Sequence, residues 1–331
     1  TLSGADELQG IGNRMAQEYK SVFAGKGMDV YMTEKVRTQQ SANAFLLAFK
    51  NYHQANIRRS IIPDSVDYML RFYDLSPAYQ DYKKSEFIKN RLDSLVNDKH
   101  TAEAVENVCK KIFRPAFAEK LLAKGVEAAG GKSKKVTATM FAESLYDLYC
   151  TQFLSHKEAA AKGYNIDFGS AFDESDLQWF DKLSNAEDFF EKGPATDASG
   201  IQAAIAAPLL ADLLRTTDAV IQGTKHIDAV LRFTHAEAIS PLATLLGIWQ
   251  ASVTSPSVFT FDKYWQAAGI IPMSANIQWI LYYNGKDYLV KVLLNEQEAK
   301  LPLPAYAFPY YRLSDLQGWY KNVLQQAQQK W

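Results

Sequence analysis

The placement of the strand-like runs most constrains how this chain can fold, because these runs gather at its two ends. Short apolar runs that predict strands lie on both sides of a long middle stretch, at residues 28–32, 229–234, 278–283 and 288–294. The middle stretch, from about Ala55 to Gly193, has an almost entirely helical pattern rich in Lys, Asp, Ala and aromatic side chains. This distribution favours one α/β domain built from both ends, with a helical domain inserted into it.

Turn and helix-cap residues along the sequence support this division. Asn284-Gly285 between two apolar runs predicts a β-hairpin, and Ser240-Pro241 predicts the cap and first residue of a helix that reaches Trp249. Further amphipathic helices are expected at 209–221 and from Leu313 onward. We therefore expect three segments: a first part of the core at 1–54, a helical insertion at 55–195, and a second part of the core at 196–331.

The charge balance limits the classes of partner. Thirty-six basic and thirty-seven acidic side chains leave a net charge of −1, which argues against bulk binding to nucleic acid or to a membrane surface. No apolar run approaches the roughly 18 residues of a membrane span. The two cysteines, Cys109 and Cys150, are too few for a disulfide framework, and the pattern leaves open whether they pair. The chain starts at Thr1 without Met, which predicts a processing or truncation boundary there.

The run at 229–234 leads into an imidazole and a carboxylate. Leu231-Arg-Phe-Thr is followed by His235-Ala-Glu237, and a capped helix is expected just after Glu237. In open α/β sheets, ligands gather outside the carboxyl ends of the strands, where helix amino termini also favour anions. The segment therefore predicts a phosphate site, while the pattern alone also fits an ordinary polar surface loop.

A second segment has the same layout. The run that ends at Thr33 leads into a helix, and Arg37 lies near the junction. A guanidinium at this place can bind phosphate through two parallel hydrogen bonds, supported by the amide groups of the helix. Arg37 alone would more often be a solvated surface residue, but two junctions of one kind strengthen the prediction for both.

These segments resemble a known family. The pattern Thr33-x-x-x-Arg37-Thr-x-x-Ser41-Ala is similar to the histidine acid phosphatase segment whose arginine binds the scissile phosphate. His235-Ala-Glu237 resembles the proton-donor motif of the multiple inositol polyphosphate phosphatases, whose relatives carry His-Asp instead. Further stretches resemble this family in its own order: Leu2-Ser-Gly4, Leu70-Arg-Phe-Tyr-Asp74, Ser274-Ala-Asn276 and Leu293-Leu-Asn-Glu296.

The resemblance implies a fold and a chemistry. The fold would be a phosphoglycerate-mutase-like three-layer α/β core with an inserted helical domain. The reaction would hydrolyse inositol hexakisphosphate (phytate) and lower inositol phosphates to inorganic phosphate through a phosphohistidine, with no metal or organic cofactor. Arg37 and His235 would hold the phosphoryl oxygens, and Glu237 would protonate the leaving oxygen, which needs a raised pKa or an acidic working pH. A periplasmic or secreted location is also implied.

The nucleophile of that family is missing from this sequence. Its histidine stands in an Arg-His-Gly-x-Arg-x-Pro motif on the first strand, before the helix expected near Ser3. None of the five histidines here has Arg before it and Gly after it. We expect the nucleophile to come from a segment upstream of Thr1, and the numbered chain alone to be inactive. Two alternatives stay open: an inert anion-binding fragment, or an acid phosphatase of the same family with another phosphomonoester substrate.

A substrate with several phosphates needs more than one polar contact. Basic clusters occur along the expected insertion, and most suit solvated helix faces. Arg58-Arg59 is the first candidate to reach the site, because it follows soon after the helix that carries Arg37. Asn276, within one of the resembling stretches, is a further candidate for substrate binding.

Overall fold

The computed structural model describes residues 1–23, 25–52, 56–127 and 135–330. The chain forms two compact units. One comprises residues 4–88 and 188–331 and is called the core unit here; the other comprises residues 1–3 and 89–187 and is called the helical unit. The helical unit is shorter than the insertion expected at 55–195, and the expected domain boundaries stay a prediction.

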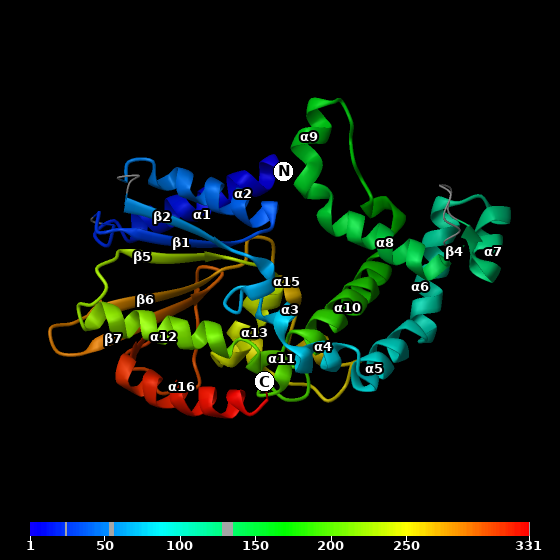
Figure 1. The fold of residues 1–331 in the computed structure, drawn as a ribbon. Helices are drawn as coiled ribbons and strands as arrows, with labels where there is room; N and C mark the ends of the chain where they lie inside the picture. Colours follow the sequence, from blue (N-terminus) through cyan, green and yellow to red (C-terminus); the bar gives the residue numbers. More distant parts are fainter. Residues whose placement is uncertain (24, 53–55, 128–134, 331) are drawn as a thin grey trace. The chain divides into compact units, whose positions relative to one another are not determined.

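A parallel sheet organises the core unit. Its strands are β1 (Met28–Thr33), β2 (Ile57–Ile62) and β5 (Ala229–Phe233), in the order β2-β1-β5 (Figure 1). Almost every residue of β1 is buried, as expected for the central strand of a parallel sheet. Both pairings run in register to the carboxyl ends, with Met32 beside Phe233 and Thr33 beside Ile62.

The strand β2 corrects the expectation of a helical pattern from residue 55 onward. Its sequence Ile-Arg-Arg-Ser-Ile-Ile contains three β-branched isoleucines, which suit a strand. Four of its six residues are exposed, because β2 pairs with β1 on one side only and lies at the edge of the sheet. An edge strand without an apolar face gives no clear alternation, so its signal resembles that of a polar helix.

Two helices, α1 (Leu2–Glu18) and α2 (Val36–Leu46), pack with the sheet in one apolar cluster. The cluster combines buried residues of both helices, of β1 and of the segment after α2: Ile11, Met28, Val30, Met32, Ala42, Phe45, Leu46, Phe49 and Tyr52. The two helices touch at Gly12, where a Cβ atom would lie 2.5 Å from the carbonyl oxygen of Phe45. Only glycine fits this contact without moving α2.

Another helix, α12 (Ala207–Ile221), lines a cavity of about 240 Å³ together with residues of all three parallel strands, including Tyr31, Ile62 and Val230. The helix α16 (Leu313–Gln328) packs against α12 and against an antiparallel sheet. That sheet contains the predicted hairpin, formed by β6 (Ile277–Tyr283) and β7 (Tyr288–Leu294), with Tyr283 opposite Tyr288. Two shorter strands, β8 (Gln297–Glu298) and β9 (Tyr310–Arg312), also pair with β7.

The helix after β5 differs from the sequence prediction. The helix α13 spans Ala236–Leu245, so it starts at the end of the strand and encloses Pro241, which was expected as its first residue. His235 has extended backbone angles and takes the N-cap position. Since proline has no amide proton, Pro241 cannot donate to the carbonyl of Glu237 one turn earlier. The helix begins five residues earlier than the Ser240-Pro241 pair indicates, and Glu237 belongs to its first turn.

The remaining helices of the core unit are short. They include α3 (Phe72–Leu75), α4 (Pro77–Lys83), α11 (Ile201–Ala204), α14 (Trp249–Ser252) and α15 (Ala267–Ile270). The helices α5 (Glu86–Val96) and α10 (Glu174–Glu191) carry the chain between the two units.

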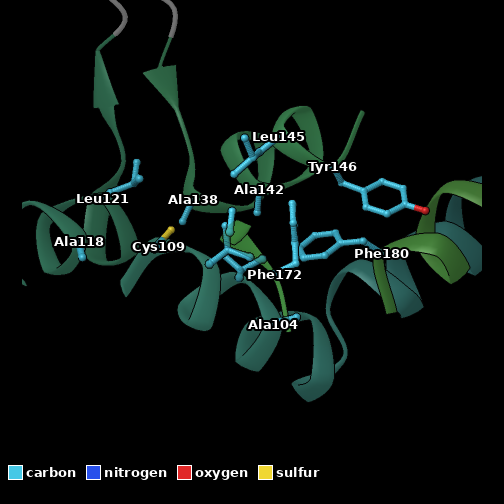
Figure 2. Packing of buried hydrophobic residues seen from close by; sticks show 13 residues of the cluster. Ala104, Cys109, Ala118, Leu121, Ala138, Ala142, Leu145, Tyr146, Phe172 and Phe180 are labelled. Atoms are coloured by element: carbon cyan, nitrogen blue, oxygen red, sulfur yellow. The ribbon is translucent and has the colours of Figure 1, made fainter. Parts of the chain in front are cut away.

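The helical unit has a hydrophobic core of its own. Its elements are α6 (Lys99–Ile112), α7 (Pro115–Lys124), β3 (Val126–Glu127), β4 (Lys135–Val136), α8 (Ala138–Thr151) and α9 (His156–Ala161), together with most of α5 and α10. Figure 2 shows part of this core, where the ring of Tyr146 stacks on Phe180 at 5.8 Å and Phe172 meets Phe180 edge-on at 5.7 Å. Cys109 is buried in this core, and both Cys109 and Cys150 are free thiols. Within the described ranges, no helix is long and apolar enough to cross a membrane.

Candidate active site

The two predicted strand–helix junctions meet at the carboxyl edge of the parallel sheet. β1 and β5 are neighbours and run in the same direction, so Thr33 and His235 follow the paired ends of adjacent strands. α2 and α13 begin at Val36 and Ala236, just beyond these ends. Two helix amino termini therefore face one edge of the sheet, where their dipoles favour an anion.

Arg37 and His235 form a direct contact at this edge. The Arg37 Nη2 atom lies 2.9 Å from Nδ1 of His235, and Nε of Arg37 donates to the same nitrogen at 3.3 Å. Since a guanidinium can only donate, Nδ1 carries no proton, and the neutral ring carries its proton on Nε2. Nε2 lies 3.1 Å from the hydroxyl oxygen of Thr33, which is fully buried and accepts the hydrogen bond from Nε2.

The charge state of His235 follows from these contacts. Burial, together with the neighbouring Arg37 guanidinium, lowers the pKa of His235 from 6.5 to about 4. Its imidazole is therefore neutral at weakly acidic and neutral pH. Among the described residues Arg37 forms no direct salt bridge, and its hydrogen bonds to the His235 ring go to a neutral partner.

Glu237 stands in the first turn of α13, beside the same residues. Its side chain is 36% exposed, and its Oε1 lies 3.8 Å from Nζ of Lys192. Burial works to raise the pKa of Glu237, but Lys192, the helix amide, His235 and Arg37 outweigh burial and lower the pKa overall. The expected raised pKa of a proton donor is therefore not a property of this ligand-free site.

The short helix α3 provides a wall that sequence reasoning did not assign to the site. Tyr73 packs edge-on against the His235 ring, with 6.3 Å between the ring centroids. The guanidinium of Arg71 lies over the Tyr73 ring at 5.5 Å and forms salt bridges with Asp64 and Asp74. Thr234 donates to the carbonyl of Leu70 at 2.7 Å and so ties this segment to the end of β5. The only sequence signal for this wall was the resemblance of residues 70–74 to the family, and that resemblance assigned them no function.

Three predicted substrate-binding residues contact other parts of the core unit. Arg58 pairs with Asp29 at 2.6 Å near the amino end of the sheet, and Arg59 donates to the Asn43 side chain on α2 at 2.9 Å. Four strand residues, about 13 Å, separate Asp29 from Thr33 along β1. These contacts give Arg58 and Arg59 partners away from Arg37, and a role of the pair in substrate binding stays a prediction.

Asn276 forms structural contacts at the start of β6, and its role in substrate binding stays a prediction. Its amide nitrogen donates to Asn295 at 3.0 Å, and its side-chain oxygen accepts from Gln278 at 3.1 Å. These bonds link the start of β6 to the turn after β7. Asn276 shares no described contact with Arg37, His235 or Glu237.

Three other histidines share no described contact with Arg37, His235 or Glu237. His100, His156 and His226 are exposed; the first two belong to the helical unit, and His226 precedes the amino end of β5. His53 lies outside the described residues. Among the described residues, no group of three or more His, Cys, Asp or Glu side chains could hold a metal ion.

Comparison with protein families places the chain in a known superfamily. The family model of the histidine phosphatase superfamily (branch 2) matches residues 1–295. The chain belongs to this superfamily. The three site residues fall within the matched part, and the mixed α/β fold agrees with that of solved members. Comparison with curated protein sequences gives no match.

Solved structures extend the likeness over nearly the whole chain. The multiple inositol polyphosphate phosphatase of Bifidobacterium longum, in complex with inositol hexasulfate, is 25% identical with a TM-score of 0.79, and the match covers 95% of this chain and 77% of that one. Its complex with phosphate matches at 24% identity and a TM-score of 0.80, covering 95% and 78%. The phytase of D. castellii is 14% identical with a TM-score of 0.66, covering 98% and 63%, and supports the fold alone.

Proposed function

We propose that this chain provides the phosphate-holding and proton-donating residues of an inositol polyphosphate phosphatase that acts on phytate and its lower phosphates. The observation that carries the proposal is the pairing of Arg37 with a neutral His235 at the carboxyl edge of the sheet. A cation that forms no direct salt bridge among the described residues, between two helix amino termini, suits a phosphate group. The B. longum relative, named for this activity and solved with inositol hexasulfate, supports the same substrate class.

In this proposal the reaction has two steps. A histidine attacks the phosphorus atom, a phosphohistidine forms, and the P–O bond to the inositol breaks. Arg37 and His235 hold the phosphoryl oxygens and stabilise the charge that develops on them. Glu237 gives its proton to the leaving inositol oxygen, then accepts a proton from the water that hydrolyses the phosphohistidine.

The proton on Glu237 depends on the substrate. In the ligand-free site its pKa is lowered, so the carboxyl is ionised at neutral pH. A bound phosphate group brings negative charge next to Glu237 and favours its protonated form. The proposed enzyme therefore works at acidic pH, in keeping with a secreted or periplasmic location.

The proposed nucleophile is not His235. Its ring is engaged by Arg37 at Nδ1 and by Thr33 at Nε2, which fits a residue of the phosphate-holding group better than a free attacking imidazole. No histidine of the 331 residues stands in an Arg-His-Gly sequence. We propose that a segment carrying that motif supplies the attacking imidazole and that the 331 residues alone bind phosphate without turning it over.

A first experiment assays the purified 331-residue chain with phytate, after mass spectrometry has excluded any co-purifying peptide. Phosphate binding without turnover is expected. Phytate turnover by the verified chain would refute the assignment of the nucleophile to another segment. If addition of the Arg-His-Gly segment also gives no turnover on any phosphomonoester, an inert anion-binding role replaces the proposal.

A second experiment tests the acid in the enzyme joined to its nucleophile. Glu237→Gln keeps the shape of the side chain but cannot donate a proton, so kcat on phytate should fall about 10²–10⁴-fold with little change in KM. The loss should be much smaller for aryl phosphates, whose leaving groups need no proton. Equal losses on both substrates would contradict the role of Glu237, and a preference for small phosphomonoesters in the unmodified enzyme would point to another substrate.

A further inference from the structure

A largely buried lysine, Lys192, lies between Asp188 and the proposed acid Glu237. Lys192 directly follows α10, where its amide donates to the carbonyl of Asp188 at 3.1 Å. Its side chain is only 14% exposed. The Nζ atom lies 2.8 Å from Oδ1 of Asp188 and 3.8 Å from Oε1 of Glu237. One ammonium group thus joins the end of α10 to the first turn of α13.

Three neighbouring carboxylates keep this ammonium charged. Burial alone lowers the pKa of Lys192, but Asp188, Glu237 and Glu191 outweigh burial and raise the pKa overall. The charge acts in return on Glu237, where Lys192 is the largest influence that opposes burial. A buried carboxyl without this cation would hold its proton more tightly.

The contacts of Lys192 are unequal, and the difference indicates its role. The distance to Asp188 is that of a direct charged hydrogen bond, whereas the distance to Glu237 allows attraction with at most a loose contact. Asp188 therefore fixes the position of the ammonium, and Glu237 experiences its field. Attraction at this distance can be offset by a new negative charge beside Glu237.

Other groups around Glu237 come from four further elements. Arg37 on α2 and His235 at the N-cap lower its pKa, together with Lys192. Two tyrosines, Tyr73 on α3 and Tyr79 on α4, respond to the charge of Glu237. Lys83 on α4 and Glu191 on α10 form a salt bridge with each other at 2.8 Å. Lys192 is the cation of this group that directly approaches the Glu237 carboxylate.

We propose that Lys192 is a positioning residue that keeps Glu237 ionised while the site is empty, and that a bound phosphate or sulfate group overcomes this hold. Glu237 then takes up its proton only when an anion is present, and Lys192 sets the pH at which this happens. The inference rests on the proposed role of Glu237 as the acid. It adds a residue that acts through Glu237 and does not touch the phosphorus atom.

The test measures the Glu237 carboxyl directly, in the 331-residue chain and without turnover. Glutamate labelled with carbon-13 at the side-chain carboxyl is incorporated, and the Glu237 resonance is identified by its loss in Glu237→Gln. Lys192→Gln should shift the titration midpoint of this resonance to higher pH, while Lys192→Arg should keep it near that of the unmodified chain. Inositol hexasulfate, whose charge is constant across this range, should shift the midpoint upward in the unmodified chain.

A second variant covers the case in which Lys192→Gln does not fold. Asp188→Asn removes a negative charge and leaves the ammonium to Glu237 alone, so the midpoint should move to lower pH. Circular dichroism checks that each variant is folded. An unchanged midpoint in a folded Lys192→Gln, or an upward shift in Asp188→Asn, would overturn the role of Lys192. A midpoint that does not respond to bound inositol hexasulfate would overturn the release by an anion.

These outcomes are separate from those of the proposed function. The resonance reports a protonation equilibrium, whereas the acid role of Glu237 is tested by the turnover of Glu237→Gln on phytate and aryl phosphates. Glu237 can titrate under the control of Lys192 even if it is not the proton donor. The converse result is a strong loss of turnover in Glu237→Gln together with an unchanged midpoint in Lys192→Gln. That result would refute the role of Lys192 and leave the acid role of Glu237 intact.

Discussion

The two edges of the parallel sheet carry similar cations but leave them in different states. At the amino edge, Asp29 accepts from Arg58 at 2.6 Å and lies 2.8 Å from Nζ of Lys225, so both cations have a carboxylate partner. At the carboxyl edge, the guanidinium of Arg37 faces the neutral ring of His235. The difference shows that the partner of a cation decides whether its charge is available to a ligand. The identity of the basic residue does not decide it.

The largest expected effect compares Arg37 with Arg58 in anion binding. Arg37→Gln in the 331-residue chain should lower the affinity for inorganic phosphate by roughly 10–100-fold, because hydrogen bonds to charged groups contribute about 1.5–3 kcal/mol. Arg58→Gln is the matched control and should change the affinity less than about twofold, since its charge is already paired. Isothermal titration calorimetry at pH 5 measures both. Similar losses in the two variants would erase the distinction between the edges.

A smaller effect concerns the pH dependence of anion binding at the carboxyl edge. With its pKa lowered to about 4, His235 is neutral at pH 5, and a bound anion should favour its protonated form. Sulfate affinity in the Glu237→Gln background should therefore fall as the pH rises from 5 to 6.5, by at most about tenfold per pH unit. The additional change His235→Asn should flatten the curve. Sulfate is suitable because it does not titrate in this range, and a flat curve with His235 present would contradict proton uptake by the ring.

The smallest effects distinguish the edges by stability. His235 has a folded pKa below that of the unfolded chain, so its contribution is present above pH 6.5 and is lost as the pH falls towards about 4. Although burial opposes the shift, Arg58 and Lys225 lower the pKa of Asp29 overall, so its contribution is lost only below its ordinary value of 3.8. Urea unfolding at a series of pH values measures the free energy of unfolding. His235→Asn should reduce its pH dependence in the window between pH 6.5 and about 4, and Asp29→Asn should reduce it in the window below pH 3.8. At pH 7, Asp29→Asn should cost about 1 kcal/mol. Overlapping windows would show that the edges do not titrate independently.

The sequence predicted the parts of the site that depend on local pattern. Apolar runs that lead into Arg37 and into His235-Ala-Glu237 are short-range signals, and parallel pairing brings them together. The edge strand that carries Arg58 has polar residues on both faces, so its place in the sheet was not visible in the pattern.

Other parts depend on tertiary contacts that no local pattern contains. Lys192 reaches Glu237 only because the end of α10 packs beside the start of α13, far along the chain. The lowered pKa of Glu237 follows from that contact and could not be predicted from the motif. Asn276 lies in a stretch that resembles the family, but its polar atoms are used to join two strands.

Because of the contact between Gly12 and Phe45, a change at residue 12, outside the candidate site, is expected to affect the position of Arg37. α2 behaves as a stiff rod, with Phe45 near one end and Arg37 near the other, about 12 Å away along the axis. A methyl group at residue 12 would press on the backbone at Phe45 and tilt the rod, because 2.5 Å leaves no room for it. The tilt would displace the guanidinium from the His235 ring. The alignment of Arg37 with His235 thus depends on the close contact between α1 and α2, where residue 12 has a hydrogen atom in place of a side chain.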